Sequence, residues 1–472
     1  MSSANDVDIL VIGSGVAGLA AALSAREHGA ARVLISEAER VVGGSSRLSG
    51  GLIMGAGTRY QKARGIEDTA DSLFHDYIQL NQWQVETGVV RRFADAAGPT
   101  VDWLGDQGVE FHDRLVFGGD ERVPRVHVPI GYGQAVVEVL HRRCREAEVD
   151  IALDRRIDHL IVDVDGVVRG AAVGDDAITA GAVIMASGGF GSDPDKLRAH
   201  YPSAATTEWS WYIGAEGSRG DALDLGAQVR AQVVGHDRGL RLLHPGFTSI
   251  YEPYLPGWMM LLNGEGHRFC DETAPYGIMD SLVRAQSDRV YAVFDHTTIG
   301  AATVDRAARY KHTIPGLRVR QSPNWNLDTI EQEVRSGKVH AAQTLTELAA
   351  QLGLPPDHVT ASVQRYNAHA DAGQDGDYLK AAQFLEPIGT APFYGAEVRP
   401  ATVCLTSCGL RIDRDAAVLD EDGRVVVGLY AAGECTGGVM GAVYVGSGNS
   451  YANCAVFGRV AGAGAARSLA LA

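Results

Sequence analysis

The sequence predicts an α/β fold in which helices flank a mainly parallel sheet and a smaller α+β domain is inserted into the chain. Three observations carry this prediction. The first forty residues alternate an apolar strand, a helix of small residues and a second apolar strand. Two later apolar strands, at 182–186 and 425–431, end in a glycine turn, as the first strand does. Between about 240 and 400 the sequence instead carries aromatic and proline-rich loops with isolated amphipathic helices.

These changes of character divide the chain into three segments. With 472 residues, 46% of them hydrophobic, the chain is long enough for two or three domains. We expect 1–238 and 399–472 to form the two parts of one domain. The segment 239–398 is expected to form an inserted cap domain.

The first strand leads into Gly13, Gly15 and Gly18 at G-x-G-x-x-G spacing. In this pattern the first glycine permits a sharp turn, the second lets the backbone approach a diphosphate, and the third lets helix and strand pack closely. The helix N-terminus then offers N–H groups to the anion. Glu37 ends the second strand about 20 residues on, where a carboxylate accepts hydrogen bonds from a ribose. The alternative is a solvent-facing acid at a strand end.

The other elements are predicted in order along the chain. A glycine and serine loop at 41–51 follows the second strand, and helical periodicity runs over 66–105 and 136–144. Residues 151–173 alternate and break at Asp165 and Gly166, which indicates antiparallel strands joined by a turn. Helices are expected near 339–352 and 358–371, and a helix rich in alanine and glycine from about 449 to 472.

Charge and composition exclude several classes of protein. The net charge of −16 argues against nucleic acid or an anionic membrane as the main partner. No apolar stretch reaches the roughly 18 to 20 residues of a membrane helix, and no secretory signal is visible. The six cysteines form no C-x-x-C pair, and the fifteen histidines are scattered, so we expect no metal site and a reducing, cytoplasmic location.

Five stretches together resemble the FAD-dependent fumarate reductase and 3-ketosteroid dehydrogenase superfamily over nearly the whole chain. They are the N-terminal cradle with Glu37, and the segments 43–46, 186–189, 264–272 and 428–434. The resemblance implies a Rossmann-like FAD-binding domain of the glutathione reductase type. It places Glu37 on the adenosine ribose, Glu434 near the ribityl chain, and a helix opened by Asn449 and Ser450 at the pyrimidine end of the flavin. That helix N-terminus would stabilise the negative charge of reduced flavin.

The expected FAD is bound non-covalently, because members with a covalent flavin place a histidine in the loop where this chain has Ser45, Ser46 and Arg47. The cofactor-binding residues expected from the cradle and the resemblance together are Gly13, Gly15, Val16, Ala17, Gly18, Glu37, Ala38, Gly44, Ser45, Ser46, Ser49, Gly50, Gly51, Ala186, Ser187, Gly188, Gly433, Glu434, Asn449 and Ser450.

Fumarate itself is excluded as the substrate. The superfamily's fumarate reductases carry an arginine proton donor where this chain has Tyr276. Thr406 and Met440 replace their carboxylate-binding histidines, and Val443 with Tyr444 replaces an Asn-Arg pair. Without these cations a site cannot hold two carboxylates.

The segment 439–448 instead resembles the Val-Met-Gly-x-x-Tyr-Pro-Gly-x-Gly segment of 3-ketosteroid Δ1-dehydrogenases. Carried over, the Tyr444 hydroxyl and the Gly448 N–H donate to a substrate ketone, and Tyr276 is the base. A tyrosine base needs a lowered pKa or a proton relay. The helper tyrosine of the relatives would lie near Phe117, which cannot relay a proton, and Tyr132 is an unaligned candidate.

The leading hypothesis is therefore an FAD-dependent desaturase that introduces a C=C bond next to the carbonyl of a cyclic ketone. The ketone is a 3-ketosteroid or a smaller ring such as 4-oxocyclohexanecarboxylate, with Arg47, Arg241 or Arg268 available for an acid group. Electrons would leave to oxygen, a quinone or a separate carrier. The alternatives are an enone or enoate reductase running in the opposite direction, and a flavin carrier without its own substrate.

Overall fold

The computed structural model describes residues 5–205, 209–248, 250, 252, 254–300 and 322–471. The chain divides into two compact units. Unit 1 consists of Met1–Thr206, Tyr212–Leu240 and Cys404–Ala472, and unit 2 of Thr207–Trp211 and Arg241–Val403. The sequence-based boundaries at 238/239 and 398/399 are close to the changes after Leu240 and Val403.

Unit 1 is built on a sheet whose main strands run in the order β17-β18-β8-β1-β2-β5. The five strands from β18 to β5 are parallel, and β17 pairs antiparallel with β18. Their bounds are β1 Val7–Ile12, β2 Val33–Ser36, β5 Asp150–Ala152, β8 Asp176–Met185, β17 Ala417–Leu419 and β18 Val425–Ala431. Because β18, β8 and β1 are parallel neighbours, the three glycine turns that follow them lie at one edge of the sheet.

Two further strands are added beside β8. Strand β7 (Val168–Val173) pairs antiparallel with β8, and β6 (His159–Val162) pairs antiparallel with β7. The turn between them contains Gly166 at a φ of 79°, as the break in the sequence predicted. The prediction was wrong for Asp150–Ala152, because this strand pairs parallel with β2 rather than antiparallel with β6. Alternation along a strand shows which face is buried but not which strand is its partner.

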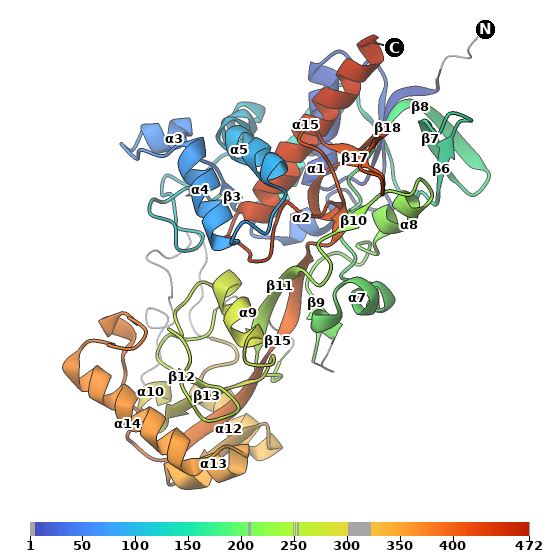
Figure 1. Ribbon diagram of the computed structural model, residues 1–472. Coiled ribbons are helices and arrows are strands. Elements are labelled where there is room, and N and C mark those ends of the chain that lie inside the picture. The colour runs from blue at the N-terminus through green and yellow to red at the C-terminus, as the bar shows by residue number, and fades with distance from the viewer. Residues whose placement is uncertain are drawn as a thin grey trace. The chain divides into compact units, whose positions relative to one another are not determined.

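Helices α1 (Val16–Glu27) and α15 (Asn449–Leu471) are far apart in the sequence but pack against one another in unit 1 (Figure 1). Glycines on α15 allow the close approach. A Cβ at Gly458 would lie 2.3 Å from the Ala17 carbonyl oxygen, and one at Gly462 would lie 2.1 Å from that of Ala21. Ala472, which the prediction placed at the end of this helix, lies outside the described residues.

The other helices of unit 1 differ from the predicted ranges in two places. The expected helical stretch 66–105 is two helices, α4 (Ala70–Leu80) and α5 (Thr87–Gln107), and the expected loop at 41–51 contains a short helix, α2 (Gly44–Leu48). The remaining elements are α3 Arg59–Lys62, α6 Tyr132–Glu146, α7 Pro194–His200, α8 Asp221–Ala227, η1 Pro202–Ala205, η3 Gly433–Cys435, and the short strands β3 Ile53–Met54, β4 Val126–His127, β10 Val233–Val234 and β16 Gly409–Leu410.

Unit 2 contains an antiparallel sheet in the order β11-β15-β13-β12, with β9 and β14 also paired to β15. The strands are β9 Trp211–Tyr212, β11 Gly239–His244, β12 Met260–Leu262, β13 Val290–Asp295, β14 Val339–Ala342 and β15 Phe393–Thr406. The helices are α9 Tyr276–Arg284, α10 His296–Gly300, α12 Leu327–Ser336, α13 Leu345–Leu352, α14 Pro356–Ala372 and η2 Ala382–Phe384. β9, β11 and β15 each run past the ends of unit 2 into residues assigned to unit 1.

The core of unit 2 is aromatic, with Trp258, Phe294 and Trp325 in one buried cluster. The predicted helix 339–352 was wrong in its first part, since Val339–Ala342 pairs with β15 as a strand. None of the helices formed by the described residues combines the length and the apolar character that crossing a membrane requires.

Candidate cofactor and active site

A cleft enclosing about 710 Å³ opens in unit 1 at the glycine-turn edge of the sheet. It is lined by residues that the sequence assigned to the cofactor, namely Gly13, Gly15, Ala17, Glu37, Ala38, Gly44, Ser45, Ser46, Ala186, Ser187, Gly188 and Glu434. These residues come from the ends of β1, β2, β8 and β18 and from α2, so the fold brings four distant parts of the sequence to one site.

The three glycines of the first turn serve different purposes. Gly13 has a φ of 103° and lies so near β8 that a Cβ would be 2.4 Å from the Ala186 carbonyl oxygen. A Cβ at Gly18 would lie 1.9 Å from the Gly13 oxygen. Gly15 differs, because its φ of −61° suits any residue and the nearest protein atom to a Cβ would be Ser46 Oγ at 3.4 Å. Packing therefore requires Gly13 and Gly18, whereas Gly15 keeps space open in the cleft.

The Glu37 carboxylate is held at the end of β2 by the turn after β1. It accepts hydrogen bonds from Ser14 N at 2.8 Å, from Ser14 Oγ, and from Glu39 N at 2.8 Å. The residue is buried and lines the cleft, so the interpretation as a solvent-facing acid does not fit.

The loop and helix after β2 close one side of the cleft. Ser46 Oγ accepts from Val16 N at 3.0 Å, and Ser45 Oγ accepts from Ala215 N at 2.9 Å. Ser49, Gly50 and Gly51 lie beyond α2 and do not line the cleft. They join this loop to α6, where a Cβ at Gly51 would be 2.4 Å from Gly133 N.

Glu434 approaches the cleft from the end of β18, directly after Gly433, whose φ is 84°. Thr406 donates to its Oε1 through the backbone N–H at 2.9 Å and through Oγ1 at 3.1 Å. Burial raises the pKa of Glu434 to about 7, although both hydrogen bonds from Thr406 oppose this rise. The carboxyl group can therefore be neutral or ionised near neutral pH.

The beginning of α15 brings together the residues predicted for the flavin and for the ketone. Ser450 N–H donates to the Tyr444 hydroxyl at 3.3 Å, and that hydroxyl donates to Ser450 Oγ at 3.3 Å. Burial raises the pKa of Tyr444 in spite of these bonds, so the phenol stays protonated at neutral pH and is a donor. Gly448 has a φ of 87°, and its N–H has no hydrogen-bond partner within the described part of the chain.

The residues present fit an FAD molecule on three observations. Gly15 leaves room for a ligand where protein packing does not need a glycine. The fully buried Asn449 gives its Nδ2 to Tyr77, while its Oδ1 has no partner among the described residues and suits a donor such as the flavin imide N–H. Ser187 Oγ, at the cleft, is likewise buried without a described partner.

Sequence reasoning missed part of the lining. The additional residues are Ile12, Ser14, Ser36, Glu39, Arg155, Arg156, Ile157, Ala215, Gly217, Ser218, Asp221, Ala432 and Cys454. Ser14 lies within the glycine motif and Arg155 follows β5, so their positions could have been inferred from the parallel sheet. Residues 215–221 follow a loop with no recognisable motif, and only the fold brings them to Glu39, whose Oε1 accepts from Gly217 N at 2.8 Å.

Tyr276, the predicted base, is the first residue of α9 in unit 2. Its ring packs against Tyr254 with centroids 5.5 Å apart. Of the two positions weighed for a proton relay, Phe117 has no ionisable group, and the Tyr132 hydroxyl in unit 1 is a buried atom without a described hydrogen-bond partner. No residue is thereby established as the relay.

Two of the three arginines considered for an acidic substrate are already neutralised. Arg241 is fully buried and bonds Asp280 and Asp288 at 2.8–3.1 Å. Arg268 bonds Glu272 at 2.9 and 3.0 Å and Asp375 at 2.8 Å. The expectation that either one is available for a substrate carboxylate was wrong, because these ion pairs leave no uncompensated charge on the two guanidinium groups. Arg47 lies 3.8 Å from Glu39 and is partly exposed.

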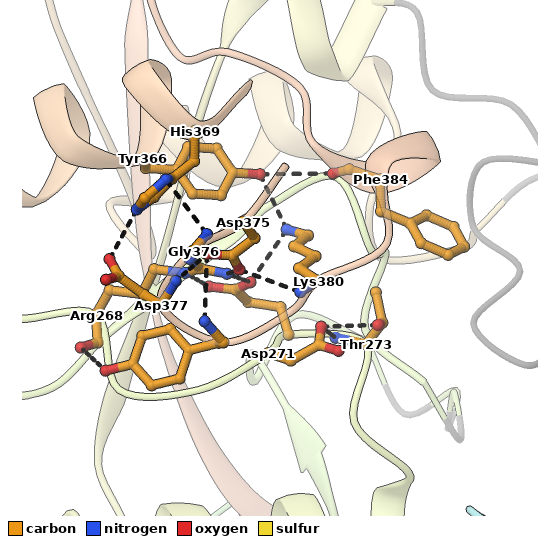
Figure 2. A network of polar contacts seen from close by, with 12 residues as sticks. Arg268, Asp271, Thr273, Tyr366, His369, Asp375, Gly376, Asp377, Lys380 and Phe384 are labelled. Carbon is orange, nitrogen blue, oxygen red and sulfur yellow. Dashed lines mark hydrogen bonds and ion pairs between the residues drawn. The ribbon is translucent and has the colours of Figure 1, made fainter. Parts of the chain in front are cut away.

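Figure 2 shows the network around Arg268 in unit 2. Lys380 and Glu272 form an ion pair at 3.1 Å with no exposed side-chain surface. Within the described residues, His369, Asp375 and Asp377 bring potential metal-ligand atoms within 4.8 Å of one another. Asp375 is already bonded to Arg268, and Asp377 is bonded to Arg365 and to the imidazole Nε2 of His369. These contacts indicate a structural network.

Thr406 and Met440 stand where fumarate reductases would carry histidines, and both side chains are engaged within the protein. Thr406 Oγ1 donates to Glu434 and accepts from Phe190 N at 3.3 Å, while Met440 is buried and apolar. Neither side chain offers a cation to a carboxylate.

Comparison with known proteins identifies the family. A family model described as an FAD binding domain matches residues 8–451. The chain is 30% identical to vinyl phenol reductase of Lactiplantibacillus plantarum over 93% of this chain and 91% of that protein. It is 30% identical to fumarate reductase (cytochrome) of Shewanella frigidimarina over 98% of this chain and 77% of that protein.

Among solved structures, 3-ketosteroid-delta4-(5alpha)-dehydrogenase of Rhodococcus jostii RHA1, in complex with 4-androstene-3,17-dione, is similar with a TM-score of 0.80 and 25% identity. The match covers 99% of this chain and 98% of that chain. These matches confirm the predicted α/β FAD-binding fold with an additional domain. The chain therefore belongs to the FAD-dependent fumarate reductase and 3-ketosteroid dehydrogenase superfamily, and it is an FAD-dependent oxidoreductase that acts on CH–CH bonds.

Proposed function

We propose that this protein desaturates a cyclic ketone next to its carbonyl group, with FAD bound non-covalently as the hydride acceptor. The observation that carries the proposal is the pair of hydrogen-bond donors at the N-terminus of α15. The Tyr444 hydroxyl stays protonated, and the Gly448 N–H has no partner among the described residues. Such a pair suits one ketone oxygen on which negative charge develops.

The proposed reaction removes one proton and one hydride from neighbouring carbons. Tyr444 and Gly448 donate to the ketone oxygen, which acidifies the adjacent C–H bond. Tyr276, as a phenolate or while passing its own hydroxyl proton to a relay, takes the proton from that α-carbon, and FAD, when bound, would accept the hydrogen of the β-carbon with its electron pair. The products are an α,β-unsaturated ketone and reduced flavin, which an external oxidant such as oxygen, a quinone or a carrier must reoxidise.

An uncharged ring fits the site better than a keto acid. Arg241 and Arg268 are each paired with two carboxylates, and Thr406 and Met440 supply no charge. The complex of the Rhodococcus relative with a steroid diketone supports a ketone of the 3-ketosteroid kind. A smaller oxocyclohexane ring carrying an acid group would depend on Arg47.

Two substitutions test the assigned roles. Tyr444→Phe and Tyr276→Phe each remove one oxygen, and each should lower turnover of a cyclic ketone with a dye acceptor by about a hundredfold or more. FAD content should be unchanged in both. Near-normal turnover in either variant would refute the role of that tyrosine.

A second candidate is the reverse reaction, reduction of a C=C bond conjugated with a carbonyl or phenol. The 30% identity with a vinyl phenol reductase over most of both chains favours it. In this case flavin reduced with dithionite under anaerobic conditions should be reoxidised rapidly by 4-vinylphenol or cyclohexenone. The oxidised protein should then show no reduction by the saturated ketone.

A further inference from the structure

The loop 439–448 carries both proposed oxyanion donors and contains little regular structure of its own. Gly441, Gly446 and Gly448 have φ values of 71°, 155° and 87°. A loop of this kind does not fix the direction of a hydroxyl or an N–H unless neighbouring groups hold it. We propose that Tyr77 and Asn81, from α4 and its C-terminus, are positioning residues that fix this loop for the oxyanion donors. This inference rests on the proposed function.

The Tyr77 hydroxyl joins the two ends of the loop. It donates to the Val439 carbonyl oxygen at 2.8 Å and accepts from Asn449 Nδ2 at 3.0 Å. Val439 opens the loop, and Asn449 follows it as the first residue of α15. Burial raises the pKa of Tyr77, so the hydroxyl keeps the proton that the bond to Val439 requires.

Asn81 holds the middle of the loop. Its Oδ1 accepts from Val443 N at 2.8 Å, directly before Tyr444, and its Nδ2 donates to the Tyr77 carbonyl oxygen at 3.2 Å. The loop passes so close that a Cβ at Gly441 would lie 2.1 Å from Asn81 Oδ1. One side chain therefore couples the α4 backbone to the residue next to the tyrosine donor.

A third contact keeps the end of the loop in place. Ser447 N donates to the Gly118 oxygen at 2.8 Å, and the turn at Gly118 is in turn held by the buried carboxylate of Glu121. Tyr77, Asn81 and Gly118 thus hold both ends and the middle of the loop. The orientation of the Tyr444 hydroxyl beside Ser450 N therefore depends on residues that are far from it in the sequence. A displacement of about 1 Å at a reacting group can cost on the order of a hundredfold in rate.

Tyr77 and Asn81 are buried, and their polar side-chain atoms are engaged by the loop and the helices beside it. The Tyr77 hydroxyl bonds Val439 and Asn449, and the Asn81 amide bonds Val443 and the Tyr77 backbone. We therefore assign them a positioning role, which acts on the reaction through the loop.

The test is a double-mutant cycle on the FAD-loaded protein with two readouts. One readout is turnover of a cyclic ketone. The other is the affinity for 4-chlorophenol, whose phenolate mimics the enolate, followed through the flavin absorbance. Tyr77→Phe and Asn81→Ala should each weaken phenol binding and lower turnover about 10- to 100-fold. In combination with Tyr444→Phe neither should add a further loss, because it acts through the same hydroxyl.

Gln79→Ala, an exposed position on the same helix, is the matched control and should change neither readout. Losses that add to that of Tyr444→Phe, or unchanged phenol affinity in Tyr77→Phe, would overturn the inference. Tyr77→Phe removes a single oxygen, so it tests the inference even if Asn81→Ala does not fold. A wild-type protein that binds the phenol but shows no flavin reduction by any cyclic ketone would overturn the proposed function instead, and the phenol affinities would still test the loop.

Discussion

Gly15 and Gly13, two residues apart, should separate cofactor binding from folding. A Cβ at Gly15 meets no protein atom within 3.4 Å and would enter the cleft, so Gly15→Ala should lower FAD affinity about 10- to 100-fold while the flavin-free protein melts normally. Gly13→Ala should instead destabilise the fold by about 1–3 kcal/mol, because its Cβ would lie 2.4 Å from a β8 carbonyl oxygen. Fluorescence titration with FAD and thermal melting measure the two effects. Unchanged FAD affinity in Gly15→Ala would contradict this division.

Glu434 should make the stability of the flavin-free protein depend on pH. Its native pKa of about 7 lies above the value of about 4.3 in an unfolded chain, so between these values the native state binds more protons. The stabilisation is present below about pH 4.3 and is lost as pH rises through 7, by about 4 kcal/mol. Denaturant unfolding at several pH values should show this slope in wild type and in the exposed control Glu148→Gln. A slope that persists in Glu434→Gln would show that another group causes it.

At the residue scale, the sequence predicted functional positions best where a motif constrains the backbone. The cradle glycines and Glu37 follow from spacing and a strand end, and Gly13, Gly15 and Glu37 line one cleft. The arginines illustrate the opposite case. Arg241 and Arg268 looked available because Asp288 and Asp375, one partner of each, are 47 and 107 residues away in the chain, although Glu272, four residues after Arg268, was visible in the sequence. Ion pairs of this range leave no local pattern.

The contact between α1 and α15 depends on the absence of side chains. Gly458→Ala and Gly462→Ala would each place a methyl group about 2 Å from an α1 carbonyl oxygen, and each should lower the unfolding free energy by about 1–3 kcal/mol. Gly464→Ala is the matched control on the same helix, because its Cβ would meet the movable Tyr430 ring at 3.2 Å and the Asp415 carbonyl oxygen at 3.4 Å, an ordinary contact distance. Helix propensity favours alanine there by up to about 1 kcal/mol. Equal melting temperatures for all three variants would contradict the packing argument.

The buried ion network of unit 2 should be sensitive to the loss of one member. Burial alone would raise the pKa of Glu272, but Lys380 and Arg268 more than offset it and hold that pKa below its usual range. Glu272→Gln leaves two buried cations with less compensation and should cost about 3–5 kcal/mol. Glu397→Gln, which breaks pairs with the half-exposed Arg289 and with the partly exposed Arg399, should cost only about 1 kcal/mol. Thermal unfolding compares the two, and a cost for Glu272→Gln no larger than for Glu397→Gln would refute the argument.

At the scale of elements, strongly periodic segments were predicted with the correct type and approximate bounds, as for β1, α1, β18 and α15. The errors lie where pairing decides the structure. Val339–Ala342 continues a helical pattern in sequence yet pairs with β15, and Asp150–Ala152 joins the parallel sheet beside β2. Short segments of this kind take their conformation from a distant partner, which overrides local propensity.

At the scale of the whole molecule, the repeated glycine turns and the family motifs were sufficient to predict the fold and the cofactor from the sequence. The direction of the reaction was not predictable, since the flavin, donors and base that we propose would serve both oxidation of a ketone and reduction of its product. The chain's relatives include both a reductase and a ketosteroid dehydrogenase. The absence of the carboxylate-binding histidines and arginine of fumarate reductases narrows the range of possible substrates, but it does not determine the direction of the reaction.

The most direct test mixes the oxidised FAD-loaded protein with a saturated cyclic ketone, steroid or monocyclic, in a stopped-flow instrument without oxygen or any reductant. The account predicts rapid loss of the visible absorption of oxidised flavin, with formation of one equivalent of the unsaturated ketone. Tyr444→Phe should slow this phase strongly. A flavin that stays oxidised with every ketone, while the reduced protein is rapidly reoxidised by an enone, would contradict it.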